Sequence, residues 1–216
     1  MWQEKVYFKN NRGEKLSGIL EYPEEEQPEK AVLLLGPHPH LGGDIHNNVL
    51  ETIAKNLVYS ITLRFDYHGT GASQALLPQG ITLYDHYENL EQKKDVSLFL
   101  DDALSAWDYL ISSLPDKSIE KIAIGYSLGG YLVFALIRQR IADKALVLAP
   151  PLCKYPPVVC DQGIFCLNAQ KDFLKSEAMP ENVLADTLEE SDHFFRGHEE
   201  KVALWILEKI SEKSKI

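Results

Sequence analysis

Cysteine is scarce in this sequence, which has three residues of it, Cys153, Cys160 and Cys166, in a chain of 216. A small and odd number of cysteines argues against a disulfide-stapled fold and fits a reducing compartment. The N-terminal residues also lack the apolar core of a signal peptide. We therefore expect a cytoplasmic protein.

Long hydrophobic runs and an excess of basic residues are absent as well. No stretch approaches the roughly 18–20 apolar residues that cross a bilayer, so no membrane insertion is expected. Lys and Arg total 22 against 32 Asp and Glu, a formal net charge of −10. Nucleic acids and anionic membranes are bound through basic patches, so both are disfavoured as partners. The length and the 45% hydrophobic content predict one domain, residues 1–216, with a sizeable core.

Short apolar runs alternate with helical patterns along most of the chain. Expected strands cover residues 31–35, 60–65, 121–124, 145–149 and 164–167, and expected helices cover 45–57, 96–114, 128–140 and 198–213. Asp44 is the expected N-cap of the first helix, and an antiparallel hairpin, residues 4–8 and 15–22, precedes the alternation. This order predicts an α/β fold with a mostly parallel sheet, helices on both faces and a ligand site at the carboxyl ends of the strands.

A glycine-flanked serine stands at the end of one expected strand. Residues 125–129 read Gly-Tyr-Ser-Leu-Gly and join that strand to an apolar helix. In this setting G-x-S-x-G forms a sharp, strained turn, and a side chain at either glycine would clash across it. We predict that Ser127 is a nucleophile and that the Leu128 amide stabilises an oxyanion. The alternative is that both glycines serve close packing alone.

A serine nucleophile needs a base, and two histidines follow it in the chain. His198 is expected in the first turn of the last helix beside two glutamates, which is a solvated position. His193 lies in a loop after a weak strand at 183–188, where the base of a site ordered serine–acid–histidine is found. We predict His193 as the base; the alternative is a structural histidine packed against the adjacent phenylalanines.

The predicted acid is Asp172, because it lies in the loop that follows the strand at 164–167. Asp192 adjoins the predicted base and cannot easily reach its far ring nitrogen. Asp186 is expected within a strand, and Asp161 lies at the wrong end of the sheet. The alternative for Asp172 is an ordinary surface carboxylate.

The loop after the first buried strand is rich in histidine, proline and glycine. His38, His40 and His46 raise the possibility of a metal-dependent hydrolase. The H-x-H-x-D-H pattern of such enzymes is missing, because Gly42 and Gly43 stand where the aspartate and the histidine would be. We therefore expect no bound metal and no cofactor, and we keep the metallohydrolase as a minor alternative.

The same loop can supply the second amide of an oxyanion hole. Pro37 and Pro39 have no N–H, so the candidates are the amides of His38, His40 and Leu41. We predict His38, because the flanking prolines fix its surroundings.

Two further segments carry no catalytic motif. Residues 66–73 contain G-x-G, which alone is weak evidence for a dinucleotide and is expected to be a structural turn. Residues 74–93 contain apolar and aromatic side chains that either wall an acyl pocket or cover the sheet. Only residues 150–163 follow the strand at 145–149, too few for a cap domain, so we expect an open site for short or medium acyl chains.

Four stretches resemble the α/β-hydrolase superfamily, and more narrowly a group of small bacterial lidless serine hydrolases. They are GPHPHLGGDIHNN at 36–48, RFDYHGTGAS at 64–73, GYSLGG at 125–130 and SDHFFRG at 191–197. The resemblance extends over nearly the whole chain. It implies an α/β-hydrolase fold with an N-terminal hairpin and no large cap domain.

The resemblance also implies a Ser127, Asp172 and His193 triad, with His38 and Leu128 as oxyanion donors. The chain departs from the group in two places. Gly36 replaces a usual histidine, and the acid loop reads Asn-Ala-Gln-Lys-Asp in place of G-D-x-D.

The function expected from these residues is hydrolysis of a small ester-like substrate, a carboxylic ester or thioester, through an acyl-enzyme. A non-catalytic binding protein of the same fold is the main alternative. The sequence does not name the substrate, and it carries no indication of oligomeric state.

Overall fold

The computed structural model describes residues 1–24, 27–139, 141–155, 162–176 and 179–212. Cys160 lies outside these residues. Within them, Cys153 is exposed, Cys166 is buried, and both are free thiols. None of the helices described is both long enough and apolar enough to span a membrane.

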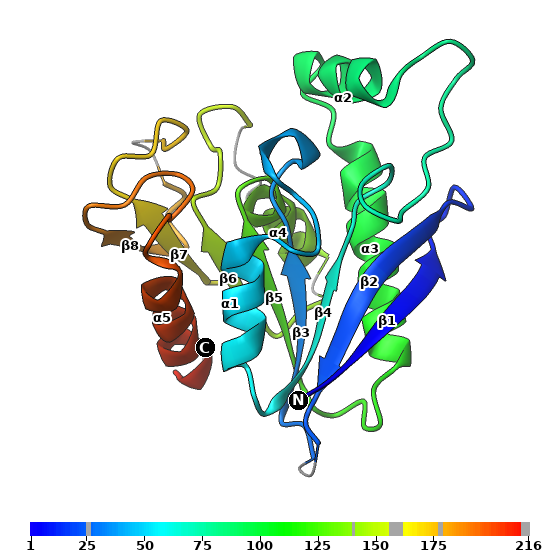
Figure 1. Ribbon diagram of the computed structural model, residues 1–216. Helices are drawn as coiled ribbons and strands as arrows, with labels where there is room; N and C mark the ends of the chain where they lie inside the picture. The colour runs from blue at the N-terminus through cyan, green and yellow to red at the C-terminus, as the bar shows by residue number, and fades with distance from the viewer. Residues whose placement is uncertain (25–26, 140, 156–161, 177–178, 213–216) are drawn as a thin grey trace.

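One sheet runs through the centre of the molecule, with strands in the order β1-β2-β4-β3-β5-β6-β7-β8 (Figure 1). Strand β2 pairs antiparallel with β1 and with β4, and the other neighbours are parallel. The strands are β1 Trp2–Lys9, β2 Lys15–Tyr22, β3 Lys30–Leu35, β4 Ser60–Phe65, β5 Glu120–Tyr126, β6 Lys144–Leu148, β7 Ile164–Ala169 and β8 Val183–Leu188. The mostly parallel sheet and the N-terminal hairpin confirm the predicted fold class.

Helices cover both faces of this sheet. Their bounds are α1 Asn48–Asn56, α2 Leu83–Gln92, α3 Ser97–Ser112, α4 Leu128–Arg138 and α5 Glu199–Ser211, and a short 3-10 turn, η1, covers Pro39–Leu41. Helices α3 and α4 pack on one face and α1 and α5 on the other. Strand β3 is buried on both sides: Leu33 and Leu35 face the first layer, and Val32 and Leu34 face the second. An unbroken apolar run is what a strand needs in that position.

The first helix begins later than the sequence pattern indicates. Its N-cap is Asn47, whose side chain accepts hydrogen bonds from the amides of Val49 and Leu50. The prediction of Asp44 was wrong, because its carboxylate accepts from the His46 amide in the preceding turn instead. His46 therefore precedes the helix.

Helix α2 was not expected from the sequence. It lies within the segment 74–93 and stands beyond the carboxyl ends of the central strands (Figure 1). Thr82 and Asp85 form a capping box at its start, with each side chain bonded to the other residue's backbone amide. The Thr-x-x-Asp spacing is a sequence signal for such a start, although glutamate is commoner at the last position.

A buried network of polar groups joins the N-terminal hairpin to α3 and the loop after β4. The Asp102 side chain is fully buried and accepts from His68 Nδ1 at 2.6 Å, Asn10 Nδ2 at 2.8 Å and Arg12 Nη2 at 2.7 Å. Burial alone would raise the pKa of the Asp102 carboxyl, but its hydrogen bonds and the charge interaction with His68 outweigh burial and lower it. The carboxylate is therefore ionised and fully partnered.

Replacing Asp102 by Ala removes the carboxylate that His68 Nδ1 contacts and one of the two buried carboxylates that pair with Arg12, the other being Glu14. The expected loss in the free energy of unfolding is about 3–5 kcal/mol at pH 7, measured by urea denaturation. Asp101→Ala is the matched control: it also removes an Arg12 partner, but one with a partly exposed carboxylate, so about 1 kcal/mol is expected. Because the folded-state pKa of Asp102 is lowered, its contribution is present at neutral pH and disappears as the pH falls through that value. Equal losses in the two variants would contradict this account.

Candidate active site

Ser127 sits on a strained turn between β5 and α4. Its backbone has φ 53° and ψ −117°, a combination that residues with a side chain rarely adopt. The two flanking glycines make the turn possible. A Cβ on Gly125 would lie 2.1 Å from the Gly129 carbonyl oxygen, and a Cβ on Gly129 would lie 2.2 Å from that of Leu35. The clash expected from the sequence is therefore present on both sides of the serine.

Three predicted site residues meet at this turn. The His193 Nε2 atom lies 3.0 Å from Ser127 Oγ, and His193 Nδ1 lies 2.9 Å from both carboxylate oxygens of Asp172. Ser127 is 2% exposed, and the His193 and Asp172 side chains are each 1% exposed. The three side chains thus form one continuous hydrogen-bonded chain shielded from bulk water.

Neighbouring loops fix the histidine and the acid. The Tyr126 hydroxyl donates to the His193 carbonyl oxygen at 2.9 Å, and burial raises the pKa of that tyrosine, so it stays protonated. The Leu174 amide donates to Asp172 Oδ1 at 2.8 Å. The two loops are also joined by a hydrogen bond, which the Lys171 amide donates to the Ser191 carbonyl oxygen at 2.9 Å.

The residues that were considered and not chosen as the catalytic acid or base make other contacts. The Asp192 carboxylate accepts from the Phe194 amide, and Asp186 accepts from the Trp205 indole. His198 is the N-cap residue of α5. Asp161 lies outside the described residues.

The His-Pro loop folds back onto the nucleophile turn. The Gly129 amide donates to the Gly36 carbonyl oxygen at 3.0 Å, and the Tyr67 hydroxyl donates to the same oxygen at 3.2 Å. A Cβ on Gly43 would lie 1.9 Å from the Pro37 carbonyl oxygen, so the loop closes only with glycine there. Gly36 therefore supports the loop through its backbone, with no need for a histidine side chain.

The three candidate oxyanion amides of this loop differ in whether they already donate a hydrogen bond. The His40 amide donates to His38 Nδ1 at 3.2 Å, and the Leu41 amide donates to the His38 carbonyl oxygen at 2.7 Å. Within the described residues, the His38 and Leu128 amides have no hydrogen-bond acceptor. Burial, with the nearby charges of His40 and Lys154, lowers the pKa of His38 to about 4, so its ring is neutral at pH 7.

The histidines of this loop do not gather as a metal site. His38 Nδ1 is taken by the His40 amide, and His46 is exposed and lies 3.2 Å from Glu51. In the part of the chain that the structure describes, His40 lies instead with Glu88 and Glu91, with ligand atoms within 4.8 Å of one another. The site of the minor metallohydrolase alternative, His38 with His40 and His46, is therefore not assembled among the described residues.

The glycine-rich segment 66–73 is the structural turn expected from the sequence. Asp66 is fully buried and accepts from the Ile45 amide at 2.9 Å and from Ser17 Oγ at 2.7 Å. A Cβ on Gly71 would lie 2.3 Å from the Asp66 carboxylate. The segment thus ties the turn before α1 to β2.

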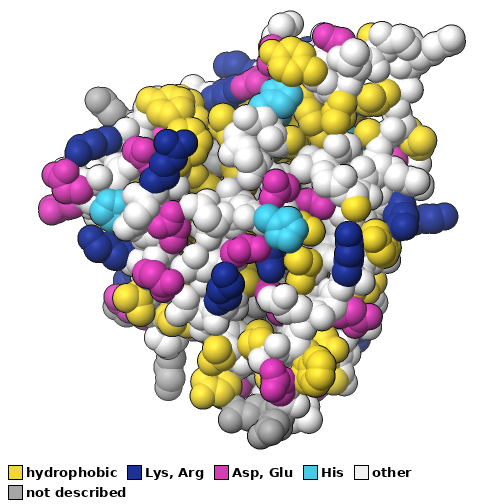
Figure 2. Space-filling model, in the orientation of Figure 1, with side chains coloured by type: hydrophobic (Ala, Val, Ile, Leu, Met, Phe, Trp, Pro, Cys, Tyr) yellow, Lys and Arg dark blue, Asp and Glu magenta, His cyan; other side chains and the backbone are white. Residues whose placement is uncertain are grey.

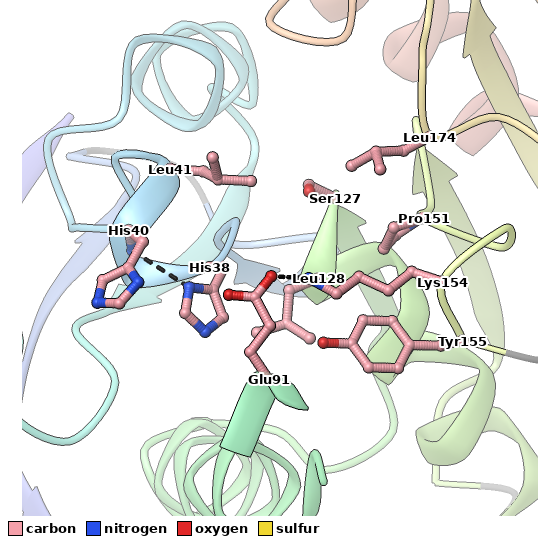
Figure 3. Close-up of a pocket in the computed structure, with 10 residues that line it drawn as sticks. All are labelled: His38, His40, Leu41, Glu91, Ser127, Leu128, Pro151, Lys154, Tyr155 and Leu174. Atoms are coloured by element: carbon pink, nitrogen blue, oxygen red, sulfur yellow. Dashed lines mark hydrogen bonds and ion pairs between the residues drawn. The ribbon is translucent and has the colours of Figure 1, made fainter. Parts of the chain in front are cut away.

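A narrow pocket of about 70 Å³ opens beside Ser127 (Figure 3). Its wall is mostly apolar, with one ion pair between Glu91 and Lys154. The lining residues are His38, His40, Leu41, Glu91, Ser127, Leu128, Pro151, Lys154, Tyr155 and Leu174.

Solved structures resemble this chain over nearly its whole length. An α/β serine hydrolase homologue from Coxiella burnetii superposes with a TM-score of 0.79 at 16% identity, covering 98% of this chain and 99% of that one. An α/β serine hydrolase without lid from Xanthomonas campestris gives 0.77 at 15% identity, covering 96% and 93%. The protein has the α/β-hydrolase fold. A protein of unknown function from Agrobacterium tumefaciens shares this fold, with a TM-score of 0.76 at 22% identity, covering 96% and 94%.

No protein-family model matches the sequence, and a search of curated proteins finds no significant relative. The α/β-hydrolase fold is thus shown by likeness to solved structures.

The strain at Ser127 predicts that a glycine at this position gives a more stable protein than an alanine. Glycine adopts φ 53° without penalty, whereas alanine keeps the strain, and both remove the hydroxyl. We expect the free energy of unfolding of Ser127→Gly to be about 1 kcal/mol larger than that of Ser127→Ala. This difference already allows for the larger conformational entropy that glycine has in the unfolded chain. Urea denaturation of the two variants measures the difference, and a less stable glycine variant would argue against a strained turn.

Proposed function

We propose that this protein is a serine hydrolase that cleaves a small ester-like substrate through an acyl-enzyme. The observation that carries the proposal is the hydrogen-bonded chain from Asp172 through His193 to Ser127. Ser127 shares a pocket with His38 and Leu128, whose amides have no acceptor within the part of the chain that the structure describes. Each part has a role in acyl transfer to water. The likeness of the fold to serine hydrolases supports the same conclusion.

In the proposed mechanism Ser127 Oγ attacks the substrate carbonyl while His193 Nε2 takes the hydroxyl proton. Asp172 fixes the imidazole through Nδ1 and stabilises its positive charge. The amides of His38 and Leu128 donate to the oxyanion. His193 then protonates the leaving alcohol or thiol, and a water activated by the same histidine releases the acid.

The pocket beside Ser127 fits the acyl part of the substrate. The leaving oxygen or sulfur must lie within hydrogen-bonding reach of His193. His193 is not among the residues that line this pocket, whereas Leu128 and His38 are. The leaving group therefore departs on the other side of the serine, and the small pocket volume favours short acyl chains.

A fluorophosphonate probe tests the nucleophile directly. We expect one covalent label per wild-type chain, none in Ser127→Ala, and the peptide carrying the label to contain Ser127, as read by mass spectrometry. Ester hydrolysis should fall more than about 10³-fold in Ser127→Ala and about 10⁴-fold in Asp172→Asn.

The same assays separate the alternatives. An unlabelled, inactive wild type would indicate a non-catalytic binding protein. Activity that is abolished by a chelator and restored by a divalent ion would indicate a metal-dependent hydrolase.

The His38 amide can be removed with little change to the backbone, because His38 has φ −59°, which proline adopts. We expect His38→Pro to lower kcat about 10²–10³-fold, the usual loss for one oxyanion donor. His38→Ala is the control, since it removes the imidazole but keeps the N–H, and it should retain far more activity. Equal losses in the two variants would show that the side chain matters and not the amide. Circular dichroism and probe labelling report whether each variant is folded.

A further inference from the structure

Helix α2 presents one face to the site. Tyr84, Tyr87, Glu88 and Glu91 are three or four residues apart, so they lie along one side of the helix. The helix belongs to segment 74–93, which connects β4 to α3 beyond the carboxyl ends of the central strands. Apolar side chains gather on the surface at this upper end of the molecule (Figure 2).

Three of these side chains rest on the His-Pro loop. The Tyr84 ring stacks on His40 with centroids 5.0 Å apart and planes at 20°, and the Tyr87 ring meets His38 edge-on at 5.6 Å. Glu88 Oε1 lies 3.8 Å from His40 Nδ1. The helix thus packs against the loop that holds the proposed oxyanion amide.

The fourth side chain reaches across the pocket. Glu91 forms an ion pair with Lys154, which belongs to the loop after β6, on the opposite side of the site from the His-Pro loop (Figure 3). Both residues line the pocket together with Ser127. The side chains are 32% and 29% exposed, so the pair is half-buried and can open to solvent.

The position of Glu91 is well defined by the rest of the helix. The capping box fixes its first turn. Near its middle, Tyr87 is buried and donates a hydrogen bond to the His68 carbonyl oxygen, and Leu90 is buried in the core. A helix anchored at these points can hold a carboxylate at one end of the pocket.

We propose that α2 is a short lid, and that the Glu91–Lys154 ion pair is the latch that closes the acyl pocket and restricts it to short acyl groups. This inference rests on the proposed hydrolase function and deepens it. A long chain would have to pass between the two side chains, which separates their charges. A short chain fits between Ser127 and the pair.

The acyl-length profile of p-nitrophenyl esters tests the latch. In Lys154→Met and in Glu91→Gln, the ratio of kcat/KM for the octanoyl ester to that for the acetyl ester should rise about tenfold over wild type. Lys93→Met is the matched control: it removes a positive charge just beyond α2 without touching the pocket, and its ratio should equal that of wild type.

Exchanging the two charges provides the decisive variant. Glu91→Lys combined with Lys154→Glu restores an ion pair of the same kind, so the ratio should return toward the wild-type value. An unchanged ratio in both single variants, or a double variant more permissive than either, would overturn the proposal.

Hydrogen exchange keeps this test independent of catalysis. The α2 amides should exchange several-fold faster in Lys154→Met than in wild type, and should be unchanged in Lys93→Met. If the wild type neither hydrolyses esters nor reacts with the probe, the proposed function fails, and this exchange result alone decides whether the latch exists. Equal exchange in all three proteins would show that the ion pair does not hold the lid.

Discussion

The close approach of two backbones, made possible by Gly129, underlies the whole site. The Gly129 amide donates to the Gly36 carbonyl oxygen, and the absence of a side chain on Gly129 leaves room for the end of β3. Any larger residue would push the His-Pro loop away from the start of α4. The His38 and Leu128 amides, which have no acceptor among the described residues, belong to these two segments, so this contact helps to set their separation. The proposed oxyanion site is in this sense a property of backbone packing.

Buried polar groups hold the remaining parts. Arg64 donates to the Ile45 carbonyl oxygen and lies 3.4 Å from Glu21, which anchors the approach to α1. Asp66 and Asp102 bind the loop after β4 to the hairpin and to α3. Unpaired charges would be costly at these depths. Arg64 faces the carboxylates of Glu21 and Glu51, and both aspartates accept hydrogen bonds from several donors. This framework gives the loops at the carboxyl ends of the strands a rigid base.

Much of this architecture was predictable from the sequence, because its signals are local. The short apolar run at 31–35, bounded by turn residues, favours a strand buried on both faces, and G-Y-S-L-G between a strand and a helix has one common geometry. Asp172 and His193 followed from their places after strands. The choice of His38 among three amides gained support only from the structure, since it depends on which of them already donate to acceptors.

Other features could not be predicted from the sequence, because they depend on competition between residues for the same role or on contacts between distant parts of the chain. Asn47 replaced Asp44 as N-cap, since both residue types favour that place and only the path of the loop decides between them. Helix α2 is short and mostly polar, and Lys154, the partner of Glu91, is far away in the chain. An ion pair between residues 91 and 154 leaves no periodic trace in either segment.

The location of α2 separates two tasks within one small protein. The serine, the histidine, the acid and the two amides stand on loops of the central sheet, whereas α2 reaches the site from a connection that bears none of them. In the proposed scheme, bond cleavage and choice of chain length then depend on different segments, and Glu91, which makes none of the helix's contacts with the His-Pro loop described above, can be altered without replacing any of the proposed reacting groups. For protein engineering, this makes the segment a natural place to retune selectivity on an otherwise fixed scaffold.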